Sequence, residues 1–177
     1  MDLKDIKELL KDGFKYILVI IIVLILIVYV VSLEQVVGSS MNNTLHSNDI
    51  VILNKISYKF RSIKRFEVVS FNYNDTKYLV KRVIGLPGEN VKYIDNTLYV
   101  DGKKVEESFI KDTKTKDFSI EELGFTKIPE NMYLVLGDNR ESSMDSRDKK
   151  VGLIHKKDIT GKVSFRIWPL TGIKFVK

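Results

Sequence analysis

The chain has 177 residues, 44% of them hydrophobic, and this length predicts one domain or one domain with a small insert. It contains no cysteine, which excludes disulfides, thiolate metal sites and thiol catalysis. The net charge of +6 suits contact with an anionic lipid surface or with nucleic acid, and does not choose between them.

Residues 16–33 form the only long apolar run in the sequence. As a helix they would be roughly 27 Å long, close to the thickness of the hydrocarbon core of a membrane. Tyr16 and Tyr29 lie near the ends, where aromatic rings prefer the interface. The run is too long for the apolar core of a signal peptide, and no small-x-small cleavage site follows it. We therefore expect an uncleaved transmembrane helix.

The distribution of lysine predicts the orientation of this helix, because basic loops stay on the cytoplasmic side. After the run, the first basic residue is Lys55. Four basic residues precede it: Lys4, Lys7, Lys11 and Lys15. We expect a cytoplasmic segment at 1–15 and an extracytoplasmic domain at 34–177. Residues 1–14 form either a short amphipathic helix on the inner leaflet or a polar extension of the anchor.

From Asp49 onward, period-two alternation and short β-branched runs predict a mostly β, antiparallel domain with little helix outside the membrane. The turn at 85–88 ends one strand, and Asp95-Asn96 joins two others in a hairpin. Residues 106–130 are polar and lysine-rich, and we expect a small insert on the rim at about 95–130. The expected strands cover residues 50–53, 67–73, 78–84, 91–94, 97–100, 132–136 and 162–167.

A basic cluster with interleaved aromatic residues follows the first of these strands. An extracytoplasmic domain would not meet nucleic acid, so lipid headgroups are the better functional interpretation. Each such charge contributes about 1 kcal/mol near an anionic surface. A solvated face is the structural alternative. The cluster consists of Lys55, Lys59, Arg61, Lys64 and Arg65.

Ser40 follows the apolar run closely, in a turn of small residues, and is a candidate nucleophile, although such a serine is more often an ordinary loop residue. The two histidines, His46 and His155, lie in a polar turn and before a lysine pair, and neither has the context of a catalytic base.

Lys81, at the end of an apolar strand, is a better candidate for the base. Burial and the neighbouring charge of Arg82 could lower its pKa from ~10.4 to about 7 to 8, where the amine is partly neutral. The alternative is an exposed strand lysine. Residues 137–147 concentrate carboxylates, arginines and hydroxyls that could brace a loop and orient a lysine, or form an ordinary polar loop.

Together these segments resemble, in order and spacing, the boxes of bacterial type I signal peptidases. The matching segments are Ser40-Met41-x-x-Thr44-Leu45, Asp49-Ile50-Val51, residues 81–89, and residues 137–147. The resemblance runs from the anchor to Trp168 and is greatest to the compact single-span form of Gram-positive bacteria. It implies a membrane-bound serine endopeptidase that removes signal peptides from exported preproteins after small-x-small sites, with no metal or cofactor.

The resemblance also implies residue roles. Ser40 would be the nucleophile, Lys81 the general base, and Ser143 the residue that orients the lysine amine. The Ser40 backbone N–H would be one oxyanion donor. Gly38 stands where some members carry a serine that supplies the second, so the second donor here would be the Gly38 backbone or a water. Structural support would come from Arg82, Asp138, Arg140, Asp145 and Arg147.

Two further expectations concern the turn and the substrate pocket. Asn43 stands where the family usually has proline, and this change should loosen the turn without removing a chemical group. A substrate in extended form would lie beside the strands, and apolar walls would reject large side chains. The candidates for these walls are Val36, Met41, Leu45, Leu79 and Val80.

Three other functions fit parts of the sequence. Self-cleaving transcriptional repressors resemble the family in their Ser/Lys dyad but lack an anchor. A non-catalytic, membrane-tethered peptidase-like binding protein would tolerate loss of Ser40. A processing peptidase dedicated to one substrate, such as a pilin, would share every motif. The expected partners are preproteins and the lipid bilayer, without nucleic acid, and the oligomeric state stays open.

Overall fold

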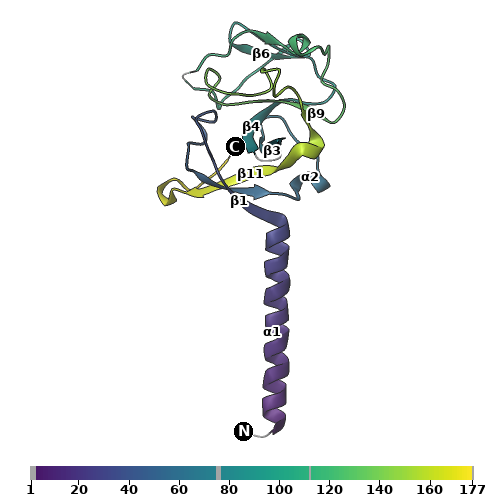
Figure 1. Cartoon of the computed structure of the whole chain (residues 1–177), viewed down its shortest axis with the longest axis vertical. Helices are drawn as coiled ribbons and strands as arrows, with labels where there is room; N and C mark the ends of the chain where they lie inside the picture. The colour runs from purple at the N-terminus through teal and green to yellow at the C-terminus, as the bar shows by residue number, and fades with distance from the viewer. Residues whose placement is uncertain (1–2, 75–76, 112, 177) are drawn as a thin grey trace.

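The computed structural model describes residues 3–74, 77–111 and 113–176 and consists of one long helix and a β-rich domain at its end (Figure 1). Helix α1 (Leu3–Val30) is continuous, so the polar N-terminal segment extends the anchor and does not form a separate helix. Its stretch Lys11–Val30 is long and apolar enough to cross a membrane. The apolar side chains described there are exposed, which leaves them available to lipid.

The helix ends three residues before the predicted end at Leu33. Strand β1 (Val31–Gln35) begins directly after it and pairs antiparallel with β2 (Ile50–Asn54). Lys55 secures the junction: its N–H donates to the Val30 carbonyl at 2.9 Å and its Nζ to the Val28 carbonyl at 2.8 Å. These bonds satisfy carbonyls that the end of a helix leaves unpaired.

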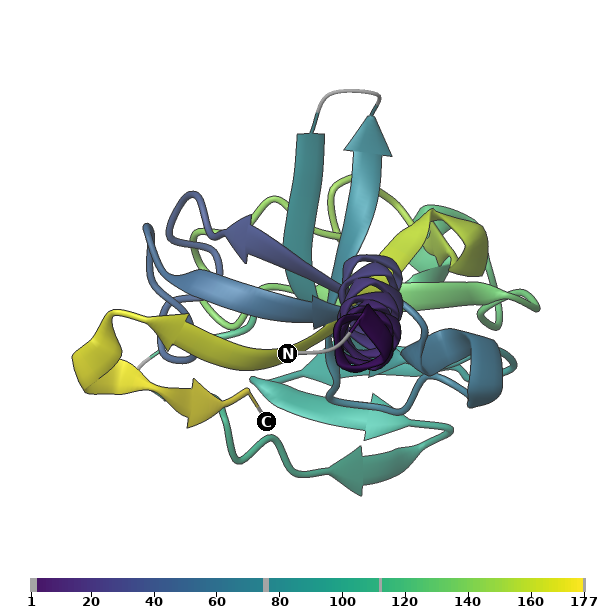
Figure 2. The same ribbon diagram turned by 90° about the horizontal axis from the view of Figure 1, so that it is seen from below.

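The larger sheet has eight strands and only antiparallel pairs, as predicted. Its order is β1-β2-β11-β3-β4-β9-β10, with β12 paired to β11. Viewed along α1, the hairpin of β3 and β4 projects from one side of the domain (Figure 2). The remaining strands of this sheet are β3 (Val68–Asn74), β4 (Lys77–Gly85), β9 (Met132–Leu136), β10 (Ile154–His155), β11 (Ile159–Trp168) and β12 (Lys174–Phe175).

The predicted hairpin of residues 91–100 belongs to a second sheet, while residues 106–111 and 113–117 of the expected rim insert form no helix or strand. The order of this second sheet is β7-β6-β5-β8, and the 3₁₀ turn η1 (Ile120–Leu123) follows. Tyr93, Leu98 and Phe118 from this sheet pack against Ile84 and Leu134 of the larger sheet. The two sheets therefore share one apolar core. The strands of the second sheet are β5 (Val91–Ile94), β6 (Thr97–Val100), β7 (Lys103–Val105) and β8 (Phe118–Ser119).

The larger sheet is buried on both faces, as the alternation along β3 shows. Val68 belongs to one apolar cluster, whereas Val69 and Phe71 belong to another. The first cluster also contains Met41 and Leu45, so the loop between β1 and β2 is anchored by two buried side chains. The short helical turns α2 (Ser57–Phe60), η2 (Lys156–Asp158) and η3 (Leu170–Gly172) complete the domain.

The basic cluster after β2 is largely used within the protein. Lys55 caps α1, Arg61 pairs with Glu67 at 2.8 Å, and Arg65 pairs with Glu89. Lys59 and Lys64 are exposed. Only these two lysines therefore keep the character of a lipid-facing charge that the sequence suggested for all five.

Candidate active site

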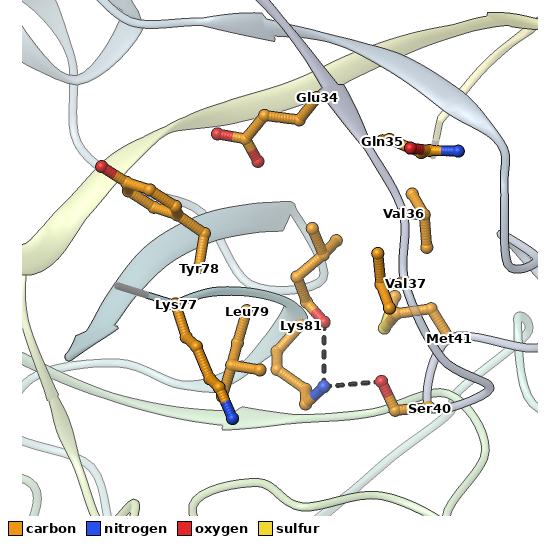
Figure 3. Close-up of a pocket in the computed structure, with 11 residues that line it drawn as sticks. Glu34, Gln35, Val36, Val37, Ser40, Met41, Lys77, Tyr78, Leu79 and Lys81 are labelled. Atoms are coloured by element: carbon orange, nitrogen blue, oxygen red, sulfur yellow. Dashed lines mark hydrogen bonds between the residues drawn. The ribbon is translucent and has the colours of Figure 1, made fainter. Parts of the chain in front are cut away.

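Ser40 and Lys81, 41 residues apart in sequence, are in direct contact (Figure 3). The Lys81 Nζ donates to Ser40 Oγ at 2.6 Å and to the Val80 carbonyl at 3.1 Å. Ser40 lies in the loop between β1 and β2, and Lys81 lies within β4, where it pairs with Val69 of β3. A serine hydroxyl and a lysine amine thus meet at one end of a groove.

The lysine amine is almost fully buried, and only 2% of the residue is exposed. Burial disfavours its charged form and lowers the pKa of Lys81 to about 8, against the opposing charges of Asp145 and Asp138. Part of the Lys81 amine population is therefore neutral near physiological pH and able to accept a proton. The guanidinium of Arg82, the neighbour in sequence, pairs with Asp138.

The loop that carries Ser40 is anchored by its buried side chains Met41 and Leu45, and it is hydrogen-bonded to the segment after β9. Asn139 donates from its backbone N–H to the Ser40 carbonyl at 3.0 Å and from Nδ2 to the Ser39 carbonyl at 3.2 Å. Gly137 lies so close to this loop that a Cβ there would overlap the Ser40 carbonyl oxygen and the Ser143 hydroxyl. The glycine therefore allows the two segments to meet.

Arg82 and Asp138 form a fully buried ion pair with two hydrogen bonds, of 2.7 and 2.6 Å. The Thr44 hydroxyl joins it, donating to Asp138 at 2.5 Å and accepting from Arg82 at 3.0 Å. One network thus connects three of the segments that carry the family resemblance. It places the Ser40 loop, β4 and the segment after β9 in a fixed relation.

Asp145 and Arg147 form the second expected ion pair, at 2.8 Å. Asp145 also accepts from the Gly137 N–H at 3.0 Å, and Arg147 donates to the Arg140 carbonyl at 2.8 Å. Burial alone would raise the pKa of Asp145, but the hydrogen bonds and charge of Arg147 hold it below its usual value. The pair closes the polar loop upon itself beside Gly137.

Ser143 does not contact the lysine amine as the resemblance led us to expect. Its hydroxyl is buried and makes no hydrogen bond of good geometry with any residue that the structure describes. It lies near enough to the Asp145 carboxylate to help lower that group's pKa. In this conformation the Val80 carbonyl, and not Ser143, is the second acceptor for Lys81.

Arg140 connects this loop to the insert: its Nε donates to the Gly137 carbonyl at 3.1 Å. Its guanidinium donates to Glu107 at 2.5 and 3.2 Å, and to the hydroxyls of Tyr93 and Thr115 at 2.9 Å each. The Phe109 ring lies 4.0 Å from the Arg82 guanidinium carbon. Sequence reasoning missed these insert residues, because Glu107 stands among several other charged residues of an irregular stretch and no pattern distinguishes it.

The conformation of Asn43 accounts for the absence of the proline that the family usually has at this position. Its φ is +91°, a left-handed conformation that proline cannot adopt. Its Nδ2 donates to the Lys111 carbonyl in the insert at 2.9 Å. The expectation of a loosened turn is therefore wrong: the side chain fastens the Ser40 loop to the insert.

The two expected oxyanion donors differ in availability. In the described part of the chain, no acceptor is paired with the Ser40 backbone N–H. Gly38 has a φ of +93°, and its N–H donates to the Ser47 hydroxyl at 3.3 Å. The geometry favours Ser40 as a donor and counts against Gly38.

A groove of about 480 Å³ leads away from the Ser40–Lys81 pair (Figure 3). Four of the five expected wall residues line it, but Leu45 is fully buried in the core beneath. Neither histidine is among the lining residues. Sequence reasoning missed five other lining residues, which together with Val36, Leu79 and Val80 make two continuous stretches: Glu34, Gln35, Val37, Lys77 and Tyr78.

The fold and this site define a β-rich hydrolase with a serine hydroxyl against a buried amine. A family model described as signal peptidase, peptidase S26, matches residues 7–168. The chain is 43% identical over 156 residues to signal peptidase I of Bacillus caldolyticus, a match covering 83% of this chain and 85% of that protein. It is 39% identical over 182 residues to signal peptidase IB of Staphylococcus aureus, covering 96% and 94%.

A crystal structure of a signal peptidase I from Enterococcus faecalis V583 shares the fold, with a TM-score of 0.52 and 34% identity. The match covers 59% of this chain and 98% of that chain. The chain therefore belongs to the signal peptidase family, peptidase S26, and is a serine endopeptidase. The family resemblance read from the sequence is confirmed.

Proposed function

We propose that this chain is a membrane-anchored signal peptidase that cleaves exported preproteins after small-x-small sites, with Ser40 as nucleophile and Lys81 as general base. The observation that carries the proposal is the 2.6 Å contact between the Ser40 hydroxyl and a buried amine whose pKa is lowered to about 8. A lysine can accept a proton only when neutral, and burial supplies that condition.

In the proposed reaction, the neutral Lys81 amine takes the Ser40 proton as Oγ attacks the scissile carbonyl. The Ser40 backbone N–H donates to the oxyanion that forms. The Lys81 ammonium then gives its proton to the leaving amine, and the signal peptide remains as an ester on Ser40. A water that loses its proton to the same amine attacks the ester and releases the peptide.

The remaining polar residues are proposed as supports of this geometry. The pairs Arg82–Asp138 and Asp145–Arg147 hold the segments that carry Ser40, Lys81 and Gly137. Ser143 would orient the lysine only after its side chain rotates toward the amine, since its hydroxyl is buried beside Gly137. Its role is therefore in a later state of the reaction than the one described.

The groove suits an extended peptide that adds a strand. β1 is an edge strand, and β9 pairs with β4 only from Arg82 onward, so residues 77–81 also present a free edge. The backbone of Val36 bonds to Asp49 and Asn48. By alternation, the polar groups of Gln35 and Val37 face the groove. Val36, Met41, Leu79 and Val80 would then form the walls that admit only small side chains.

The anchor would place this site at the outer face of a membrane. The four lysines before the apolar run favour a cytoplasmic N-terminus. The exposed Lys59, Phe60 and Lys64 near the end of α1 would contact lipid headgroups. A repressor-like function does not explain the apolar helix, whereas a dedicated processing peptidase would share all of these features.

Cleavage of a preprotein with an Ala-x-Ala site, by protein solubilised in detergent, tests the proposal. Wild type should cleave, Ser40→Ala and Lys81→Met should not, and the neighbouring Ser39→Ala should cleave like wild type. Loss in Ser40→Ala alone would move the base elsewhere, first to His46 or His155. Absence of cleavage by folded wild type would contradict a general signal peptidase and favour a dedicated substrate or a non-catalytic binding protein.

A further inference from the structure

Glu34 is a charged residue in the groove that the reaction above does not use. Its carboxylate lies at the end of the groove away from the Ser40–Lys81 pair (Figure 3). It is half-buried and accepts a hydrogen bond from the buried Ser70 hydroxyl at 2.8 Å. No lysine or arginine of the described ranges forms an ion pair with it.

The Glu34 carboxylate has fewer hydrogen-bond donors around it than it can accept. It can accept about four hydrogen bonds, and the one from Ser70 comes from a neutral group. Burial raises the pKa of Glu34 above its usual value, which shows that solvent only partly satisfies the charge. A positively charged group that enters the groove would therefore be stabilised more by this carboxylate than by a fully solvated one.

The two lysines of the groove do not supply that charge. The Lys81 amine is engaged with Ser40 and the Val80 carbonyl. Lys77 extends away from Glu34, toward the opposite side of the view in Figure 3. The complement to Glu34 must therefore come from what enters the groove.

The direction of entry follows from the anchor. β1 begins directly after α1, so the Glu34 end of the groove is nearer to the membrane than the Ser40 end. The apolar segment of a signal peptide precedes the cut, so residues before the cut would run from Ser40 toward Glu34. Val36 directly follows β1 and continues its hydrogen bonding toward β2, so Glu34 and Val36, two residues apart, point to the same side. If Val36 walls the pocket for the third residue before the cut, Glu34 adjoins the fifth.

We propose that Glu34 is a specificity-determining residue that favours a basic side chain at the fifth position before the cut. A lysine or arginine there would reach the carboxylate while the small residues at the first and third positions occupy the apolar pocket. The inference rests on the proposed function of the groove and adds a charge preference to it.

Cleavage of three peptides tests the assignment. They share an Ala-x-Ala site and differ only in Lys, Met or Glu at the fifth position before the cut. With wild type, kcat/KM should be roughly five- to tenfold higher for Lys than for Met, and lower again for Glu. Glu34→Gln should remove the ranking, Glu34→Lys should invert it, and the exposed Glu106→Gln should keep it. The ranking should also shrink at high salt.

Two controls separate the possible failures. The same three residues at the fourth position, on the opposite face of the peptide strand, should give ratios near one with every variant. Equal ratios at the fifth position in wild type, Glu34→Gln and Glu34→Lys, with all three folded by thermal melting, would overturn the role of Glu34 alone. Cleavage of none of the peptides by wild type would overturn the proposed function, and the charge preference with it.

Discussion

Replacing Asp145 by asparagine should move the pH profile of cleavage to lower pH. Burial lowers the pKa of Lys81 to about 8, while the negative charges of Asp145 and Asp138 act to raise it. Removing one of these charges leaves burial less opposed, and the loss of the partner of Arg147 adds an uncompensated positive charge nearby. Both changes make the lysine ammonium less stable, so its pKa falls further.

The size of the effect can be estimated from the site. In wild type, kcat/KM should reach half of its plateau near pH 8 and fall about tenfold for each pH unit well below that. A carboxylate in direct contact shifts a pKa by roughly 1 to 3 units. Asp145 makes no hydrogen bond to Lys81 in the described structure, so we expect a shift of about one unit or less.

The assay is kcat/KM for an Ala-x-Ala peptide between pH 5 and 9, in detergent at constant ionic strength. Asp101→Asn, which changes an exposed carboxylate, should keep the wild-type profile. The plateau of Asp145→Asn should also drop, because its loop loses a buried ion pair. If the acid limb of the Asp145→Asn profile lay at the same pH as that of Asp101→Asn, the electrostatic reasoning would be refuted. A wild-type midpoint near ~6.5 would indicate a histidine and not Lys81.

Three further predictions concern stability. Lys81→Met should raise the free energy of unfolding at neutral pH by up to roughly 3 kcal/mol, because the lowering of the lysine pKa from 10.5 to about 8 opposes folding. This cost is absent above pH 10.5, grows as the pH falls toward 8 and is constant below it, which urea titrations at several pH values would show. Glu107→Ala should cost about 3 kcal/mol by leaving the buried charge of Arg140 without its ion-pair partner, although neutral hydrogen-bond acceptors remain. The double variant Glu107→Ala/Arg140→Met should recover part of this lost stability. Equal melting temperatures for the single variant Glu107→Ala and the double variant would contradict the ion-pair argument. Asn43→Pro should lower both the melting temperature and kcat, whereas Asn43→Gly should retain most of each, since the φ of +91° suits glycine. A more active Asn43→Pro would mean that the family turn can form here.

The sequence was sufficient to predict what depends on short-range pattern. Period-two alternation placed the main strands of the large sheet, and the family resemblance implied the pairing of Ser40 with Lys81 that the structure shows as a contact. The resemblance also implied structural roles for Asp145 and Arg147, which form an ion pair within one loop.

Features that depend on long-range packing could not be predicted in this way. Residues 31–33 follow the apolar run without a break or a charge, and only their pairing with β2 makes them a strand instead of helix. Leu45 has the chemistry of a pocket wall, but the turn directs it into the core. The partners of Arg140 come from an insert more than 20 residues away in sequence, where no periodic pattern marks them.

Because no linker separates α1 from β1, the end of the anchor helix fixes the distance between the membrane and the groove. Val30 ends the helix, Val31 begins the strand, and Lys55 bonds to the carbonyls of Val28 and Val30 across the junction. At ~3.3 Å per residue, the groove wall at Val36 lies no more than roughly 20 Å beyond the helix end. A substrate whose apolar segment stops at the same level must cover that height with its own extended residues, about five or six of them. Geometry alone would then fix how far from the bilayer a preprotein can be cut.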